Sequence, residues 1–153
     1  MLTSLDLVKL QISIAAGEKL PFGQKDVRWE GHAIECRINA EDPEKNFTPS
    51  AGRIERIVMP GGPGVRIDTH VVAGCDVPPY YDPLLVKIIA WDKNRAGAIA
   101  RMQRCLKEAE IVGVKTNIAF QRTILANAFF RRGEVTTDFI QRRILGPGGD
   151  LGK

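Results

Sequence analysis

The sequence predicts an α+β fold, an antiparallel β-sheet core with flanking helices, because strand-like and helix-like segments occupy different parts of the chain. Alternation of apolar and polar residues indicates strands mainly between residues 31 and 91. Helical periodicity dominates residues 94–145, and one helical segment precedes the strands. Strands followed by helices are typical of α+β domains rather than of repeated βαβ units. We therefore expect a single domain over residues 1–146 and a flexible tail over 147–153.

The first predicted element is a helix that Thr3 or Ser4 caps and Gly17 closes. Its inward stripe is expected to consist of Leu5, Val8, Ile12 and Ala15. Residues 18–30 are loop-like, and a half-buried strand follows over 31–40, with one face formed by His32, Ile34, Cys36 and Ile38.

Three more strands are predicted, over residues 52–58, 65–72 and 84–91. The last is nearly all apolar, which predicts a central strand covered on both faces. Lys87 is its anomaly, and we interpret it as a side chain whose charged head reaches the surface, with an anion contact as the alternative.

The remaining elements are helices and one short strand over residues 111–114. Asn94 is the expected cap of the first helix, whose inward stripe is Ile99, Met102, Leu106 and Ala109. Residues 117–130 are expected to form one helix, with the inward residues Ile118, Ile124, Leu125 and Ala128. Thr136 or Thr137 should cap a last helix that ends at Leu145, before Gly146 and Pro147.

The composition is that of an ordinary globular domain, with 44% hydrophobic and 26% charged residues among 153. No apolar run approaches the roughly 20 residues of a membrane span, and the first residues lack a secretory signal's basic start. The three cysteines are widely spaced, which does not indicate zinc and favours reduced thiols in the cytoplasm. We expect a cytoplasmic protein with no metal site and no membrane contact.

The net charge of +4 is too small to indicate nucleic-acid binding by itself. The chain has no basic block, and its aromatic residues are not interleaved with cations as a stacking platform would require. Arginine supplies 13 of the 22 basic residues, which suits recognition of carboxylate or phosphate groups. A nucleic-acid module is therefore the least favoured class.

Residues 60–68 form the most informative segment, since a run of proline and glycine leads directly into a strand. If that strand begins at Val65, alternation places Arg66, Asp68 and His70 on one face. This face is either an anion site or a solvated face that follows a hairpin. The glycine-rich run is no phosphate loop, because such a loop enters a helix. The sequence contains no complete catalytic constellation.

Five segments resemble biotin carboxylases in their order and spacing, namely residues 32–43, 46–54, 60–68, 77–87 and 113–117. Residues 3–12 also resemble the helix that follows the active-site strand of the family's ATP-grasp portion. The resemblance covers residues 3–145, and Ala51 stands where the family often has a second proline. It implies the fold of the biotin carboxylase C-terminal domain, with residues 1–17 linking it to a missing ATP-grasp portion.

The resemblance implies a ligase that uses ATP, Mg²⁺ or Mn²⁺, and bicarbonate to carboxylate biotin on a carrier protein. Nucleotide and metal sites would lie upstream, so this fragment alone should bind no cofactor. Arg66 matches the family's catalytic arginine, which stabilises charge on the ureido oxygen of biotin. Gly64, Val65 and Asp68 are expected near the substrate, and Trp91 and Arg95 at the interface of a homodimer.

The sequence is therefore interpreted as a domain that supplies one wall of the biotin and bicarbonate site and a dimer surface. Its abrupt start suggests a piece excised from a longer protein, with a natural short protein as the alternative. The domain should be inactive alone. The alternative is a module without catalytic function that serves dimerisation or carrier docking. The carboxylated acceptor cannot be read from this chain, because acetyl-CoA, propionyl-CoA, pyruvate and 2-oxoglutarate carboxylases share this half-reaction.

Overall fold

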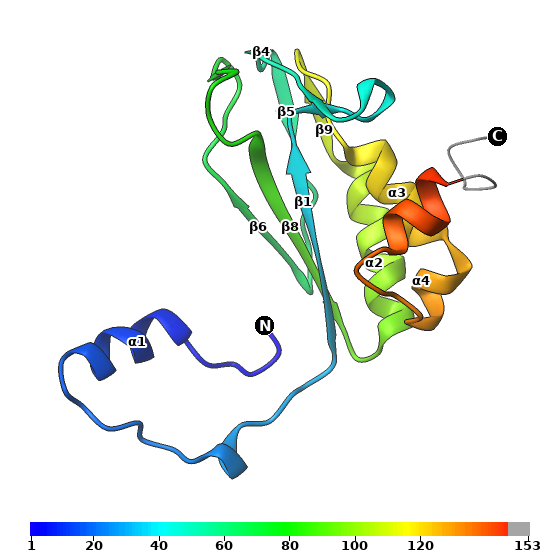
Figure 1. The fold of residues 1–153 in the computed structure, drawn as a ribbon. Coiled ribbons are helices and arrows are strands. Elements are labelled where there is room, and N and C mark those ends of the chain that lie inside the picture. Colours follow the sequence, from blue (N-terminus) through cyan, green and yellow to red (C-terminus); the bar gives the residue numbers. More distant parts are fainter. Residues whose placement is uncertain (147–153) are drawn as a thin grey trace.

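The computed structural model describes residues 1–146 and confirms the α+β class (Figure 1). Its centre is an antiparallel sheet in the order β1–β8–β6, formed by β1 (His32–Asn39), β8 (Leu84–Asp92) and β6 (Val65–Thr69). Three separate two-stranded antiparallel sheets accompany it: β2 (Glu41–Asp42) with β3 (Thr48–Pro49), β4 (Gly52–Arg53) with β7 (Asp76–Val77), and β5 (Arg56–Val58) with β9 (Glu110–Val112). The expected tail over 147–153 lies outside the described residues.

Helices cover one face of this sheet, while α1 (Leu7–Ala15) stands apart from it (Figure 1). The covering helices are α2 (Arg95–Glu108), α3 (Ile118–Ala126) and α4 (Ala128–Arg132), followed by a π-helical segment, Gln141–Leu145. Two short 3-10 segments, Gln24–Asp26 and Pro43–Lys45, lie in the connections.

The main core lies between the sheet and α2. The register places Ile34 opposite Ala90 and Ile38 opposite Val86, and all four side chains are buried against the inward face of α2. The alternation predicted for the first strand is thus confirmed. Asn94 caps α2 as expected, because its side chain accepts a hydrogen bond from the backbone N–H of Gly97.

A second apolar cluster lies under the C-terminal elements and is formed by Phe120, Phe139 and Ile144. The helix expected over 117–130 is broken at Asn127, whose side chain accepts hydrogen bonds from two N–H groups of the first turn of α4. Asparagine favours such a cap over a helix interior, which explains the break. Ala128 is therefore exposed rather than inward.

The expected last helix is also wrong in detail. Its regular part is the π-helical segment Gln141–Leu145, which has no side-chain cap, so neither Thr136 nor Thr137 caps it. The Thr136 hydroxyl instead contacts the carboxylate of Asp138, a local bond that competes with capping.

Two predicted strands are shorter than expected. Residues 52–58 form two strands with different partners, because Ile54 between them turns into the core and is fully buried. β6 ends at Thr69, whose hydroxyl donates a hydrogen bond to the carbonyl of Leu85 and accepts one from the N–H of Val71.

β8 is the central strand as predicted, but over residues 86–90 only one of its faces is closed. Val86, Ile88 and Ala90 are buried beneath α2, whereas Lys87 and Ile89 on the other face are half-buried. The expectation of cover on both faces is therefore wrong for the described residues. A nearly apolar strand sequence predicts that both faces are buried, but it does not identify the element that covers each face.

The first helix begins later than expected. Asp6 caps α1 by accepting a hydrogen bond from the N–H of Lys9 at 3.0 Å, which corrects the prediction of Thr3 or Ser4. Val8 and Ile12 of the predicted inward stripe are each 65% exposed, because no described element packs on them. The apolar periodicity correctly predicted a helix, but the expected burial of its apolar stripe is not seen among the described residues.

Candidate functional site

The face of the sheet that α2 leaves free carries the charged side chains of all three central strands. Directly opposed residues of paired strands point to the same face, so the register defines its members. One row across the sheet is Glu35, Ile89 and Arg66, and the next row is Arg37, Lys87 and Asp68. Arg66 therefore lies directly opposite Ile89, with Asp68 next to it on its own strand and the charged residues Glu35 and Lys87 elsewhere on the same face.

Arg66 and Asp68 form an ion pair on this face. The Nε of Arg66 donates a hydrogen bond to the Oδ1 of Asp68 at 2.9 Å, and their side chains are 59% and 41% exposed. This bond and the charge of Asp68 raise the pKa of Arg66, with a smaller contribution from the charge of Glu35. The guanidinium is oriented through Nε, which leaves its two terminal nitrogens directed away from that bond and suited to a planar anion.

The glycine-rich loop before Arg66 is fixed against the end of β8. Gly64 adopts a φ of +73°, and a Cβ built there would lie 2.6 Å from the carbonyl oxygen of Trp91. The Trp91 N–H donates to the Gly64 carbonyl at 2.8 Å, and Arg101 holds the Trp91 carbonyl and, at 2.8 Å, the Asp92 carboxylate. Only glycine fits this close approach, which sets the start of β6 and hence the position of Arg66.

Arg66 lies in the wall of an open hollow of about 840 Å³. Glu35, Ile89 and Ala33 of the sheet line the hollow on the same side, while Trp29 and residues 1–8 line the other. The site therefore combines a permanent cation with a carboxylate, Glu35, that sequence analysis did not assign. The strand alternation of residues 31–40 is the one sequence signal that could have placed Glu35 on this face. No local sequence signal indicates that the loop residue Trp29 lines the hollow.

The other predicted substrate-site residues are placed differently. Val65 lies opposite Ala90 on the helix-covered face and packs against the core, so only its backbone faces the site. Gly64 contributes loop geometry, as described above. His70 follows the end of β6 and is exposed, and it does not line the hollow. The structure thus brings together Arg66 and Asp68 but not His70.

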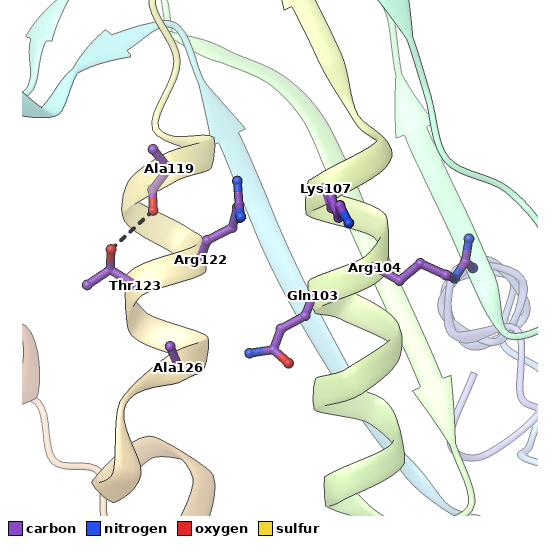
Figure 2. Close-up of a pocket in the computed structure, with 7 residues that line it drawn as sticks. All are labelled: Gln103, Arg104, Lys107, Ala119, Arg122, Thr123 and Ala126. Carbon is purple, nitrogen blue, oxygen red and sulfur yellow. Dashed lines mark hydrogen bonds between the residues drawn. The ribbon is translucent and has the colours of Figure 1, made fainter.

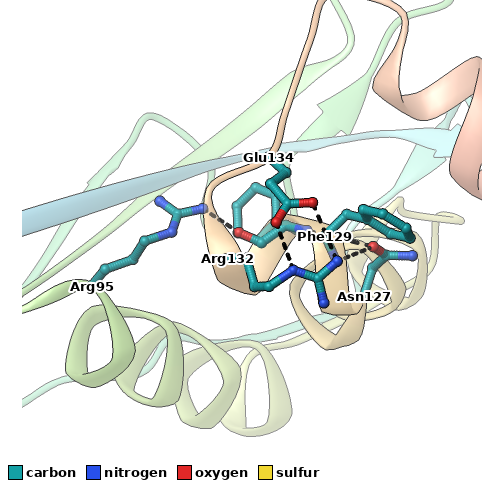
Figure 3. A network of polar contacts seen from close by, with 6 residues as sticks. Arg95, Asn127, Phe129, Arg132 and Glu134 are labelled. Atoms are coloured by element: carbon teal, nitrogen blue, oxygen red, sulfur yellow. Dashed lines mark hydrogen bonds and ion pairs between the residues drawn. The ribbon is translucent and has the colours of Figure 1, made fainter.

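The two predicted interface residues make contacts within the chain. The indole N–H of Trp91 donates to the carbonyl of Glu30 at 2.7 Å. One terminal nitrogen of Arg95 donates to Nε2 of His32 at 3.0 Å and the other to the carbonyl of Phe130. Figure 3 shows Arg95 reaching toward the segment that carries Phe129 and Arg132, where Arg132 pairs with Glu134. Their role at a dimer interface stays a prediction.

Metal-ligating clusters and membrane-spanning helices are both absent from the described residues. Within residues 1–146, no cluster of His, Cys, Asp and Glu side chains has the arrangement of a metal site. In the same range, no helix combines the length and apolar character needed to cross a membrane.

Comparison with known proteins identifies the family. The family model for the biotin carboxylase C-terminal domain matches residues 35–142. The chain belongs to this family. The resemblance drawn from five sequence segments is thereby confirmed, and Arg66 lies within the matched range.

Curated relatives agree with this assignment. A biotin carboxylase of Nostoc sp. is 52% identical over 141 residues, which are 92% of this chain and 32% of that protein. One of the pyruvate carboxylase subunits of Methanothermobacter thermautotrophicus is 47% identical over 153 residues, 100% of this chain and 31% of that protein. The chain spans about a third of the length of the curated relatives that it matches.

Solved structures share the fold. The biotin carboxylase domain dimer of Hydrogenobacter thermophilus 2-oxoglutarate carboxylase, in complex with MgADP, ADP and bicarbonate, superposes with a TM-score of 0.88 at 47% identity. It covers 92% of this chain, which corresponds to 31% of that chain. The biotin carboxylase subunit of a pyruvate carboxylase gives a TM-score of 0.89 at 47% identity, with coverage of 92% and 31%.

Proposed function

We propose that this biotin carboxylase C-terminal domain supplies one wall of the biotin and bicarbonate site of an ATP-dependent biotin carboxylase. The observation that carries the proposal is Arg66, which the pair with Asp68 holds at the wall of an open hollow. The structure of a related biotin carboxylase domain contains MgADP and bicarbonate, which supports the same ligand classes here.

In this proposal Arg66 stabilises negative charge. When N1′ of biotin loses its proton, charge develops on the ureido oxygen, and the guanidinium stays protonated at any working pH. A positioned donor beside a developing oxyanion contributes on the order of 3 kcal/mol in comparable sites. Asp68 acts as the positioning residue, because it occupies Nε and leaves the terminal nitrogens for the substrate.

The remaining components come from other parts of the enzyme. ATP and Mg²⁺ or Mn²⁺ would bind the ATP-grasp portion, and biotin would arrive on its carrier protein or domain. On the side away from the sheet, residues 1–8 and Trp29 line the hollow beside Arg66. This open arrangement is consistent with an ATP-grasp portion that completes the site. We propose a cytoplasmic homodimer, with Trp91 and Arg95 near its interface.

The test is Arg66→Ala in the enzyme that joins this domain to its ATP-grasp portion. Biotin carboxylation should fall by about 10²-fold or more, because an oxyanion donor is lost, while ATP affinity stays unchanged. Arg56→Ala is the matched control, since Arg56 is an exposed strand arginine that pairs with a carboxylate, Glu110, away from the hollow. An unchanged carboxylation rate in Arg66→Ala would remove Arg66 from the site.

A second candidate function is a module without catalysis that serves dimerisation or carrier docking. The chain's coverage of about a third of its relatives is compatible with either. The purified 153-residue chain should not cleave ATP in the presence of bicarbonate and free biotin. Such cleavage would contradict the assignment of the nucleotide site to another portion. An ATP-grasp segment encoded directly upstream would favour the enzyme over the module.

A further inference from the structure

A second hollow, of about 780 Å³, lies between α2 and α3, two helices on the face of the sheet opposite Arg66 (Figure 2). Its walls carry the basic residues Arg104, Lys107 and Arg122 together with Gln103 and Thr123. Among the described residues no carboxylate lines it, so the lining itself carries only positive charge. Nothing in the biotin carboxylase proposal uses these residues.

The three cations of the groove differ in their partners. The guanidinium of Arg104 points away from α3 and donates to the carboxylate of Glu108 at 2.6 Å and to the carbonyl of Gly61 at 3.0 Å (Figure 2). Within residues 1–146, Lys107 and Arg122 form no ion pair, and both are exposed. The net charge available to a ligand therefore comes from one lysine on α2 and one arginine on α3.

Of the two polar side chains between these cations, that of Gln103 is suited to an anion, whereas the Thr123 hydroxyl already donates its hydrogen within α3. Gln103 extends from α2 toward α3, and Arg122 projects from α3 toward α2, so that both point into the groove (Figure 2). The hydroxyl of Thr123 donates to the carbonyl of Ala119 at 3.3 Å, which is a helix back-bond and keeps the hydroxyl on the groove wall. The NH₂ group of Gln103, the ammonium of Lys107 and the guanidinium of Arg122 are thus the donors available to an anion, beside the apolar side chains of Ala119 and Ala126.

We propose that the α2–α3 groove binds a small molecule through a diphosphate group. The planar guanidinium of Arg122 matches phosphate oxygens through paired hydrogen bonds, and Lys107 adds a point charge from the opposite wall. The groove is open, and its volume of about 780 Å³ leaves room for a small molecule. Two unpaired cations are too few for the extended phosphate contacts of nucleic acid, so a small ligand fits better.

Titration calorimetry of the 153-residue chain with pyrophosphate tests this proposal. We expect one binding site per chain, with an affinity that falls as salt is added, because the charges are exposed. Arg122→Ala and Lys107→Ala should each weaken binding by about tenfold, or about 1.4 kcal/mol. The matched controls Arg28→Ala and Lys25→Ala remove the same charges from exposed positions outside the groove and should bind as the parent chain does.

Thermal unfolding of all four variants, followed by circular dichroism, serves as the control that each variant still folds. A parent chain that binds no pyrophosphate, or controls that weaken binding as much as the groove variants, would overturn the proposal. ADP serves as the second arm. If ADP binds at least as tightly as pyrophosphate and Arg122→Ala weakens both equally, the diphosphate group is the recognised part. If the chain binds ADP but does not bind pyrophosphate, the proposal is refuted. These outcomes are independent of the role of Arg66.

Discussion

Replacement of Gly64 by alanine tests how the loop before Arg66 is built. Gly64 has a φ of +73°, and the new Cβ would lie 2.6 Å from the Trp91 carbonyl oxygen and also meet the Arg101 guanidinium. Gly61 in the same loop is the matched control, because a Cβ there meets nothing within 4 Å and its φ is not positive. The two variants therefore add the same methyl group to the same loop in different surroundings.

The magnitude follows from two contributions. A residue with a side chain in the left-handed region costs roughly 1–2 kcal/mol relative to glycine. The contact with the Trp91 carbonyl forces the loop to move, and the hydrogen bond from the Trp91 N–H to the Gly64 carbonyl, now 2.8 Å, weakens. Loss of one such bond costs about 1 kcal/mol. Gly64→Ala should thus lower the free energy of unfolding by about 2–3 kcal/mol.

Urea denaturation followed by circular dichroism measures this difference in the 153-residue chain. Gly61→Ala should stay within about 0.5 kcal/mol of the parent chain, as surface substitutions usually do. In the joined enzyme, Gly64→Ala should also lower the carboxylation rate, because the displaced loop moves Arg66. Equal unfolding midpoints for the two variants would refute the argument that glycine is required at residue 64.

Three further predictions concern the stability of the chain. Met102→Ala should lower the free energy of unfolding by about 2–5 kcal/mol in urea denaturation, because Met102 is fully buried beneath the sheet. Asn127→Ala should lower it by about 0.5–2 kcal/mol through loss of the α4 cap, and an unchanged urea midpoint would argue against that cap. Burial raises the pKa of Cys36 to about 12 from a usual value of 9.0, so the folded chain holds this proton more tightly. The contribution of Cys36 to the free energy of unfolding should be complete below pH 9.0 and fall as the pH rises toward 12. Between pH 8 and 10.5, the urea midpoint of Cys36→Ala should therefore fall less than that of the parent chain.

The parts of the fold predicted correctly depend on local patterns with one dominant period. Ile34, Cys36 and Ile38 alternate with polar residues, so the sequence specifies the buried face of β1. Asn94 precedes an amphipathic segment, and both signals agree on the start of α2. In such segments, local preference and tertiary burial favour the same structure, and the pattern suffices.

The errors occur where tertiary contacts override the local pattern. Residues 52–58 are predicted as one strand, yet the burial of Ile54 separates β4 from β5, which pair with different strands. Asn127 interrupts a periodic segment by capping α4, an interaction that apolar periodicity cannot reveal. The exposed stripe of Val8 and Ile12 is a different case, because no described element covers it.

The same distinction applies to the candidate site. Strand alternation placed Arg66 and Asp68 on one face, and the structure shows that they are hydrogen-bonded, which alternation alone did not require. Glu35 comes to the same hollow only through β8, because it and Arg66 both lie opposite Ile89. β1 and β6 do not pair with each other, and each pairs with β8, which lies far from both in sequence. Alternation can assign Glu35 to a face of its strand, but it cannot show that Arg66 shares that face of the sheet.

The position of Arg66 finally depends on the face of β6 that takes no part in the site. Val65 and Ile67 pack against the core opposite Ala90 and Ile88, and this packing fixes the register of β6 against β8. A slip by one residue would turn Arg66 into the core and Ile67 toward the hollow, since side chains alternate with a period of two. Burying an unpaired guanidinium and exposing an isoleucine are both unfavourable, so the slipped pairing is excluded by several kcal/mol. The apolar residues Val65 and Ile67 therefore determine where the guanidinium of Arg66 lies. The hydrogen bond between Gly64 and Trp91 fixes the same register at the start of β6.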